Sequence, residues 1–191
     1  YKYLNGGPGA PAFMYVARRH HAALDQPISA WMGHARPFEF SVEYLPAEDI
    51  SRLLSGTPPI LSIASLEAAL DIWDQVDLSL VRAKSEAMSE LFIRVLERQL
   101  DSSYIQLASP REASRRGSHV SLRHPDGWRI VRAMIEHGKI IPDFREPDNI
   151  RFGFAPLYTS YTDIHTAVAR IVAIMSAGLH LGYDTQRGSV T

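Results

Sequence analysis

Two consecutive helical patterns constrain the fold of this chain more than any other feature of its sequence. Apolar residues recur at helical spacing from Leu66 to Val76, and a second such pattern runs from Leu80 to Leu100. Asp77 lies between the two patterns, where its side chain is expected to be the N-cap of the second helix. Because residues 65–101 form the longest regular stretch, we expect these helices to bridge two lobes of the protein.

The composition is typical of a globular protein. The chain has 191 residues, of which 46% are hydrophobic and 21% charged, enough for one or two domains with a core. Its 20 basic and 21 acidic side chains give a formal net charge of -1, so charge offers no reason to expect nucleic acid or a membrane as a partner. The sequence has no cysteine, which excludes disulfides and cysteine nucleophiles here and fits a cytoplasmic location.

The segments on either side of the helices predict a mixed α/β arrangement. An apolar run at 12–16 indicates a buried strand, of the kind found in parallel sheets. A small α+β lobe is expected after the helices. Its predicted elements are a solvated connection at 102–118 with Arg111, Arg115 and Arg116 exposed, a strand at 119–123, a helix at 126–137 with Gly138 as C-cap, an extended region at 140–156, a helix at 161–175, and a frayed tail over the last fifteen residues.

The first nine residues, YKYLNGGPG, raise a chemical question. Lys2 is one of only three lysines in a chain that otherwise uses arginine, and an amine can act as a nucleophile whereas a guanidinium stays protonated. The glycines beside it allow the backbone to approach a bulky cofactor. The spacing by itself favours an ordinary surface lysine, and a Schiff-base lysine is the alternative.

Two further side chains have unusual surroundings. Trp31 lies in the turn WMGH, and its indole N–H is a donor that suits a phosphate oxygen, although most tryptophans are core residues. Arg151 lies among Ile150, Phe152 and Phe154, where a charge needs a partner. Its planar guanidinium pairs well with a carboxylate, whereas an exposed arginine at a strand end is the ordinary interpretation.

Five segments in order resemble the kynureninase family of fold-type-I pyridoxal-phosphate enzymes. The segments are YKYLNGGPGAPAFMYV (1–16), WMGHARPFEF (31–40), LSGTPPILSIASLEAALDI (54–72), RGSHVSLRH (116–124) and NIRFGFAPLYTSYTDI (149–164). The resemblance implies a transferase-like α/β fold, with the end of the large cofactor-binding domain at 1–64, bridging helices at 65–101 and a small α+β C-terminal domain at 102–191. It also implies that the chain corresponds to the C-terminal half of the enzyme, beginning just before the cofactor lysine.

The resemblance further implies how pyridoxal 5'-phosphate is bound. Lys2 corresponds to the lysine that forms a Schiff base with this cofactor. Tyr1 corresponds to the tyrosine that reaches the cofactor phosphate and assists proton transfer. Trp31 and Thr57 correspond to residues that the partner subunit supplies to the phosphate site, so the resemblance implies a homodimer with shared active sites.

The reaction implied is the hydrolysis of L-kynurenine to anthranilate and L-alanine by Cβ–Cγ cleavage, in tryptophan degradation and NAD biosynthesis. Arg151 corresponds to the arginine that holds the substrate carboxylate, and His34 and Gly56 fall where the family contacts the aromatic ring. Gly56-Thr57 is similar to the bacterial pattern, whereas animal enzymes have Ser-Asn, which suggests a preference for kynurenine over 3-hydroxykynurenine. No metal, nucleic acid or membrane is implied.

Two other classes of function remain open at this stage. One is another fold-type-I pyridoxal-phosphate enzyme, such as a desulfurase or a lyase, but a desulfurase needs a cysteine downstream of its lysine and this chain has none. The other is a non-catalytic C-terminal lobe that serves in dimerisation.

Overall fold

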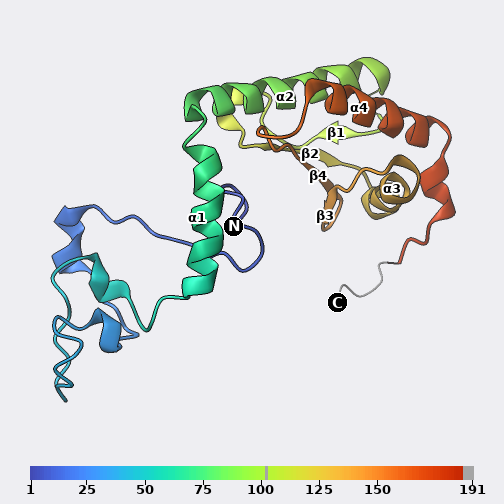
Figure 1. Cartoon of the computed structure of the whole chain (residues 1–191). Helices are drawn as coiled ribbons and strands as arrows, with labels where there is room; N and C mark the ends of the chain where they lie inside the picture. Colours follow the sequence, from blue (N-terminus) through green and yellow to red (C-terminus); the bar gives the residue numbers. More distant parts are fainter. Residues whose placement is uncertain (102, 187–191) are drawn as a thin grey trace. The chain divides into compact units, whose positions relative to one another are not determined.

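The computed structural model describes residues 1–101 and 103–186, and the chain divides into two compact units, Tyr1–Val76 and Asp77–Thr191 (Figure 1). The two long helices fall into different units, because α1 (Ile60–Trp73) belongs to the first and α2 (Leu78–Gln99) to the second. The expected three-part division of the complete fold stays a prediction. Residue 102 of the predicted connection and residues 187–191 of the predicted tail lie outside the described residues.

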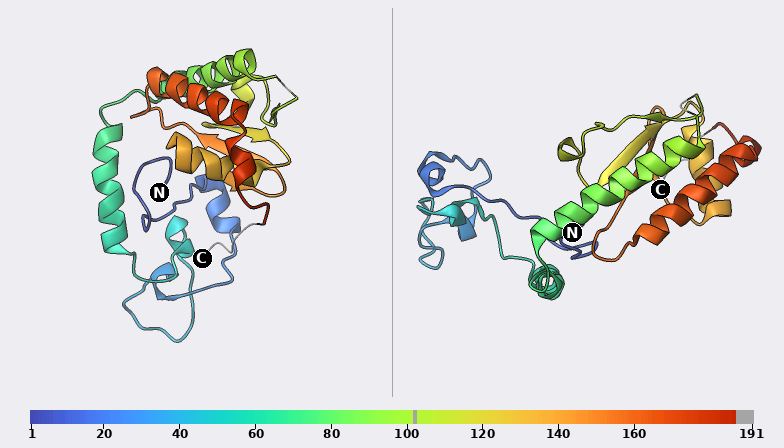
Figure 2. Two further views of the ribbon diagram at one scale, coloured as in Figure 1. Left: turned by 90° about the vertical axis from the view of Figure 1, so that its right-hand side faces the viewer. Right: turned by 90° about the horizontal axis from the view of Figure 1, so that it is seen from above.

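The C-terminal unit is an α+β fold around a four-stranded antiparallel sheet, which confirms the mixed helix and sheet content expected from the sequence. The strand order is β1-β2-β4-β3. In Figures 1 and 2, α2 and α4 lie side by side against the sheet. The elements are β1 (Gln106–Leu107), β2 (His119–Arg123), α3 (Gly127–Ala133), a π-helical turn (Met134–Gly138), β3 (Asp143–Arg145), β4 (Asn149–Gly153) and α4 (Tyr161–Ser176).

The sheet has one buried face and one open face. Val120 and Leu122 of β2 are buried, as are Ile150 and Phe152 of β4, and the ring of Phe92 on α2 lies 4.9 Å from that of Phe152. Buried side chains of α3 and α4 complete this core. The alternate positions of β2 and β4 are more exposed and carry mostly polar residues, as the two-residue period of a strand requires. The open face is therefore available for polar chemistry.

The two ends predicted for helices of this unit have different outcomes. The carboxylate of Asp77 accepts a hydrogen bond from the Ser79 N–H at 2.7 Å, which confirms the predicted N-cap of α2. The predicted C-cap at Gly138 is wrong by one residue, because Lys139 adopts the left-handed conformation with φ of 52°. Gly138 is instead buried, and a Cβ atom there would lie 3.0 Å from the Cδ1 atom of Ile174.

The connection between α2 and β2 corrects a second expectation. Arg111 and Arg115 are exposed as predicted, but the side chain of Arg116 is only 1% exposed. Its guanidinium donates to the carbonyls of Pro110 and Arg111 and pairs with Glu90 at 3.0 Å. Arg116 is therefore a buried tie between this connection and α2, because three acceptors compensate the loss of water around its charge.

The predicted frayed tail is wrong for the part of it that the structure describes. Leu179–Gly182 forms a 3-10 turn in which His180 is buried. Arg129 on α3 holds this turn, since its guanidinium donates to the carbonyls of Leu181 and Tyr183. The hydrogen bonds from Arg129 to these two carbonyls keep the segment attached to α3. The sequence of the segment itself gives no sign of them.

The N-terminal unit has little core of its own. Of residues 1–76, all of which the structure describes, only Gly33 and Ala69 are buried. The buried strand predicted at 12–16 is not formed: Phe13, Met14 and Tyr15 are exposed, and no strand in the described chain pairs with them. A strand requires a neighbouring backbone to receive its hydrogen bonds, and a run of apolar residues does not supply that neighbour.

Candidate functional site

Tyr1 and Lys2 lie on an exposed turn in the N-terminal unit. The Gly7 N–H donates to the Tyr1 carbonyl at 3.2 Å, and Gly7 has a φ of 77°, a conformation that favours glycine. The indole N–H of Trp73 donates to the carbonyl of Leu4 at 3.1 Å, which attaches the turn to α1. The Lys2 Nζ atom lies 5.3 Å from the centroid of the Tyr1 ring. Neither the Lys2 amine nor the Tyr1 hydroxyl has a hydrogen-bond or ion-pair partner among the described residues.

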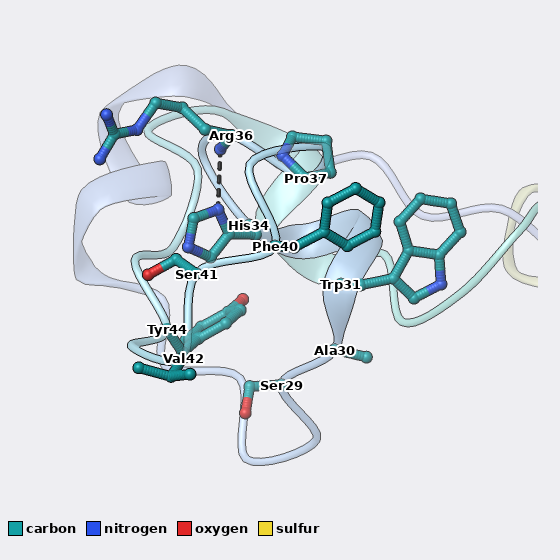
Figure 3. Close-up of a pocket in the computed structure, with 10 residues that line it drawn as sticks. All are labelled: Ser29, Ala30, Trp31, His34, Arg36, Pro37, Phe40, Ser41, Val42 and Tyr44. Carbon is teal, nitrogen blue, oxygen red and sulfur yellow. Dashed lines mark hydrogen bonds between the residues drawn. The ribbon is translucent and has the colours of Figure 1, made fainter.

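Trp31 and His34 line one depression of about 450 Å³ (Figure 3), a volume within the usual range for small-molecule sites. The Trp31 ring meets the Phe38 ring edge to face, with 5.9 Å between centroids. The Trp31 indole N–H has no hydrogen-bond partner within the described part of the chain. The remaining lining residues are Ser29, Ala30, Arg36, Pro37, Phe40, Ser41, Val42 and Tyr44.

Gly33 is not part of this lining, but it is buried and holds Tyr44, which is. Its carbonyl accepts hydrogen bonds from the Tyr44 hydroxyl at 3.1 Å and from the Ala47 N–H at 2.9 Å. A Cβ atom at position 33 would lie 2.7 Å from the carbonyl oxygen of Leu54, so only glycine fits without displacing backbone. Sequence reasoning missed Gly33 and Tyr44, because the contacts that explain them come from distant segments.

Gly56 and Thr57 lie in the turn that precedes α1, separate from the lining of the depression. A Cβ atom at Gly56 would meet no heavy atom within 4 Å. Thr57 is exposed, and its hydroxyl has no partner among the residues described. The structure therefore leaves both positions accessible without bringing them against Trp31 or His34.

Arg151 lies on the open sheet face of the C-terminal unit. In the register of β4 it stands opposite Asp143 on β3 and Ser121 on β2. One guanidinium nitrogen, Nη2, donates to the Asp143 carboxylate, which also accepts from the Arg145 Nε–H at 3.0 Å. Within the described residues, the other donors of the Arg151 guanidinium have no partner. Two arginines around one carboxylate leave one net positive charge, and the Arg151 side chain is 34% exposed.

The structure thus brings Trp31 together with His34, and Tyr1 together with Lys2, while Arg151 lies in the other unit. The functional roles of these residues stay predictions. Their chemistry fits pyridoxal 5'-phosphate, because the set contains a primary amine that can condense with an aldehyde. It also contains a phenol, an indole N–H and a hydroxyl, which are donors suited to phosphate oxygens.

The described residues contain neither a metal-binding cluster nor a membrane-spanning helix. They hold no group of three or more His, Asp or Glu side chains arranged to bind a metal ion. None of their helices is both long and apolar enough to cross a bilayer.

The fold of the C-terminal unit defines an α+β domain whose open sheet face presents arginine. Residues 81–171 match the family model described as the kynureninase C-terminal domain. The resemblance to kynureninases inferred from the sequence is thereby confirmed, and this chain is related to kynureninases over most of its length.

Three curated relatives, each named kynureninase, illustrate the relationship. The Deinococcus radiodurans protein is 47% identical over 175 residues, which are 92% of this chain and 42% of the relative. The Pseudomonas fluorescens protein is 45% identical over 168 residues, 88% of this chain and 40% of the relative. The Burkholderia mallei protein is 42% identical over 175 residues, again 92% and 42%. The chain therefore spans about two fifths of the length of these relatives.

Proposed function

We propose that this chain provides part of the active site of a kynureninase, a hydrolase that converts L-kynurenine to anthranilate and L-alanine. The observation that carries the proposal is the identity of 42–47% to kynureninases over 92% of this chain. The unpartnered amine and the arginine on the open sheet face are consistent with it. For the whole protein we infer a fold-type-I arrangement, a homodimer, a cytoplasmic location and a place in tryptophan degradation and NAD biosynthesis.

Lys2 is proposed to bind the cofactor and to move protons. Its amine is exposed and without an ion-pair partner among the described residues, so it is accessible to the cofactor aldehyde. Pyridoxal 5'-phosphate, when bound, supplies an electron sink that labilises bonds to the substrate Cα and Cβ atoms. In its neutral form the Lys2 amine removes the Cα proton, and the hydroxyl of Tyr1, on the same turn, assists this transfer.

Trp31 and Thr57 are proposed to hold the cofactor phosphate. The indole N–H and the threonine hydroxyl are both unpartnered in the described residues, and each offers a donor to a phosphate oxygen. These two residues lie in separate segments of the N-terminal unit, so each is suited to a different oxygen of one phosphate. The family resemblance suggests that this phosphate lies in the site of the partner subunit.

Arg151 is proposed to bind the α-carboxylate of the substrate. Asp143 holds the guanidinium through one nitrogen and leaves other N–H groups for a second carboxylate. The net positive charge of the Arg145–Asp143–Arg151 group favours an anion at this face. Binding at this point fixes the orientation of the Cα substituents relative to the cofactor.

Borohydride reduction of the active enzyme tests the proposal directly. We expect a stable pyridoxyl mass on the peptide that contains Lys2 and none on the peptides containing Lys84 or Lys139. A Lys2→Arg variant should lose both the modification and the activity. An active enzyme whose Lys2 is unmodified after reduction contradicts the assignment.

The proposed substrate preference is tested by comparing kcat/KM for kynurenine with kcat/KM for 3-hydroxykynurenine. Gly56 and Thr57 provide neither of the side chains found in the animal Ser-Asn pattern, so we expect kynurenine to be preferred over 3-hydroxykynurenine. A clear preference for the hydroxylated substrate contradicts the role given to Gly56 while leaving the roles of Lys2 and Arg151 intact.

A further inference from the structure

Both ring nitrogens of His34 are already used by the backbone of its own loop. The Nδ1 atom accepts a hydrogen bond from the Arg36 N–H at 2.8 Å, drawn as the dashed line in Figure 3. The Nε2 atom lies 3.1 Å from the carbonyl oxygen of Glu43. One histidine thereby joins two positions of the loop that lie on opposite sides of its tip.

These two contacts assign a hydrogen-bonding role to each ring nitrogen. A backbone N–H only donates, so the Nδ1 atom beside Arg36 must be an unprotonated acceptor. A backbone carbonyl only accepts, so the Nε2 atom beside Glu43 must carry the proton. The Nε2–H tautomer of His34 is therefore the one that fits both contacts, and neither nitrogen is free for a ligand unless a loop contact breaks.

The surrounding contacts show that His34 closes a defined loop. His34 and Pro46 form an isolated antiparallel bridge, and the Ala35 N–H donates to the Leu45 carbonyl at 2.7 Å. The Tyr44 ring stands edge-on to the imidazole, with 5.8 Å between centroids. Residues 34–46 thus form a loop closed at its base by backbone bonds and braced across its interior by His34.

We propose that His34 is a positioning residue that fixes the 34–46 loop beside Trp31, and that it makes no hydrogen bond to the substrate. The proposal rests on the proposed function in assigning the depression lined by Trp31 to a ligand. It revises the role that family resemblance suggests for His34, because a ring whose two nitrogens are occupied offers a ligand only an apolar face.

Three substitutions separate a positioning role from direct contact with the substrate. His34→Asn keeps an acceptor for the N–H two residues on, as in an Asx turn, and His34→Gln keeps a donor near the Nε2 position. His34→Phe keeps the ring and loses both hydrogen bonds. His20→Phe is the matched control, because His20 is an exposed histidine of the same unit whose side chain has no hydrogen-bond partner among the described residues.

In the active enzyme we expect the dissociation constant for pyridoxal 5'-phosphate and the KM for kynurenine to rise about threefold in the Asn and Gln variants. The Phe variant should show a rise of about tenfold, with a smaller change in kcat, because two loop contacts are lost. If His34 instead contacts the substrate through its ring, the Phe variant will retain affinity and the Asn and Gln variants will lose it. That reversed order overturns the proposal.

Two measurements on the isolated chain do not depend on activity. Nitrogen-detected NMR of the imidazole should show the proton on Nε2 and an acceptor Nδ1, and a proton on Nδ1 overturns the proposal. A glutamate-specific protease should cut after Glu39 and Glu43 about tenfold faster in the Phe variant than in the wild-type chain or in His20→Phe, and equal rates also overturn it. A wild-type enzyme that binds no pyridoxal 5'-phosphate refutes the proposed function while leaving these two results interpretable.

Discussion

Arg151 on β4 and Asp143 on β3 stand directly opposite each other in the antiparallel sheet, and their side chains form an ion pair on its open face. The two-residue period of β4 explains this placement, because Ile150 and Phe152 point into the core and so direct Arg151 outward. Asp143 limits the motion of the guanidinium without using all of its donors. The pair therefore leaves part of the Arg151 guanidinium available, as the proposed role in carboxylate binding requires.

Replacing Arg151 with alanine should weaken substrate binding far more than it weakens folding. We expect kcat/KM for kynurenine to fall about thirtyfold or more, because the substrate carboxylate loses its proposed charged partner. This corresponds to a loss of about 2–5 kcal/mol in transition-state stabilisation. Steady-state kinetics of the enzyme provide the measurement. Arg151→Lys should recover only part of the loss, since an ammonium cannot form the paired hydrogen bonds of a guanidinium.

Arg145 is the matched control for this experiment. It donates to the same Asp143 carboxylate from the same sheet, but its side chain is 60% exposed. Arg145→Ala removes one positive charge from the group, but that charge is exposed and screened by solvent, so kcat/KM should stay within about threefold. Equal losses in Arg145→Ala and Arg151→Ala would indicate a general effect of charge on this face and remove the specific role of Arg151.

A second pair of arginines tests the importance of burial for stability. Arg116 and Arg111 each pair with a glutamate of α2, Glu90 and Glu97 respectively, but only the Arg116 side chain is buried. Arg116→Ala should lower the free energy of opening of α2 by about 1–3 kcal/mol, because two carbonyl groups and Glu90 lose a buried hydrogen-bond donor. Arg111→Ala should lower it by less than about 1 kcal/mol. Amide hydrogen exchange of α2 measures both, and similar values for the two variants would contradict the burial argument.

Elements with strong local signals could be predicted from the sequence. The second helical pattern and its cap at Asp77 correspond to α2, and the strand predicted at 119–123 is β2. The helix predicted at 161–175 is α4. In each case the periodicity of the apolar residues or a capping side chain lies within the element itself, so no distant partner is needed to recognise it.

The expectations that failed depended on partners elsewhere in the chain. Arg116 sits in a run of charges that looks solvated, and only the folded connection brings carbonyls and Glu90 around it. The apolar run at 12–16 has the composition of a buried strand, but no strand in the described residues pairs with it. Gly33 in WMGH could be seen but not interpreted, because its close neighbours Tyr44 and Leu54 become adjacent only on folding.

Two glycines of the N-terminal unit should respond very differently to substitution by alanine. Gly33→Ala places a methyl group 2.7 Å from the Leu54 carbonyl oxygen and 2.9 Å from the Tyr44 hydroxyl, so the depression must distort. We expect a loss of about 1–3 kcal/mol in the stability of this unit, as for other overpacked positions. Gly56→Ala should be nearly neutral, because no heavy atom lies within 4 Å of its Cβ position.

Urea unfolding followed by hydrogen exchange of the 31–54 segment measures these two effects. Gly56 is also a predicted substrate contact, and Gly56→Ala is expected to leave folding unchanged. The kcat/KM of this variant therefore tests the predicted contact without a contribution from folding. If Gly33→Ala proves as stable as Gly56→Ala, the packing around Gly33 does not hold the depression in shape.

A pair of histidines in the C-terminal unit predicts a loss of stability on acidification. The rings of His124 and His180 lie 6.0 Å apart, and the His180 Nδ1 atom is buried without a hydrogen-bond partner in the described residues. Burial lowers the pKa of both histidines from the ordinary value of 6.5. Repulsion by His124 and Arg129 lowers the pKa of His180 further, and Asp126 acts in the opposite sense on both histidines. The unfolded chain therefore binds protons more readily than the folded chain as the pH falls through about 6.5.

Because protons favour the unfolded state, the free energy of opening of α4 should be level above about pH 7.5 and should fall between pH 7 and pH 5. The capping carboxylates Asp77 and Asp163, whose pKa values are lowered by hydrogen bonds from Ser79 and Ser160, lose their contribution only as the pH falls below their ordinary value of 3.8. Amide hydrogen exchange of α4 across this pH range therefore isolates the histidine pair.

His180→Phe should flatten the pH dependence of α4 opening, whereas His165→Phe, at an exposed position of α4 itself, should leave it unchanged. A slope that persists in His180→Phe would assign the acid sensitivity to other groups, since that variant has lost both the buried imidazole and its repulsion with His124.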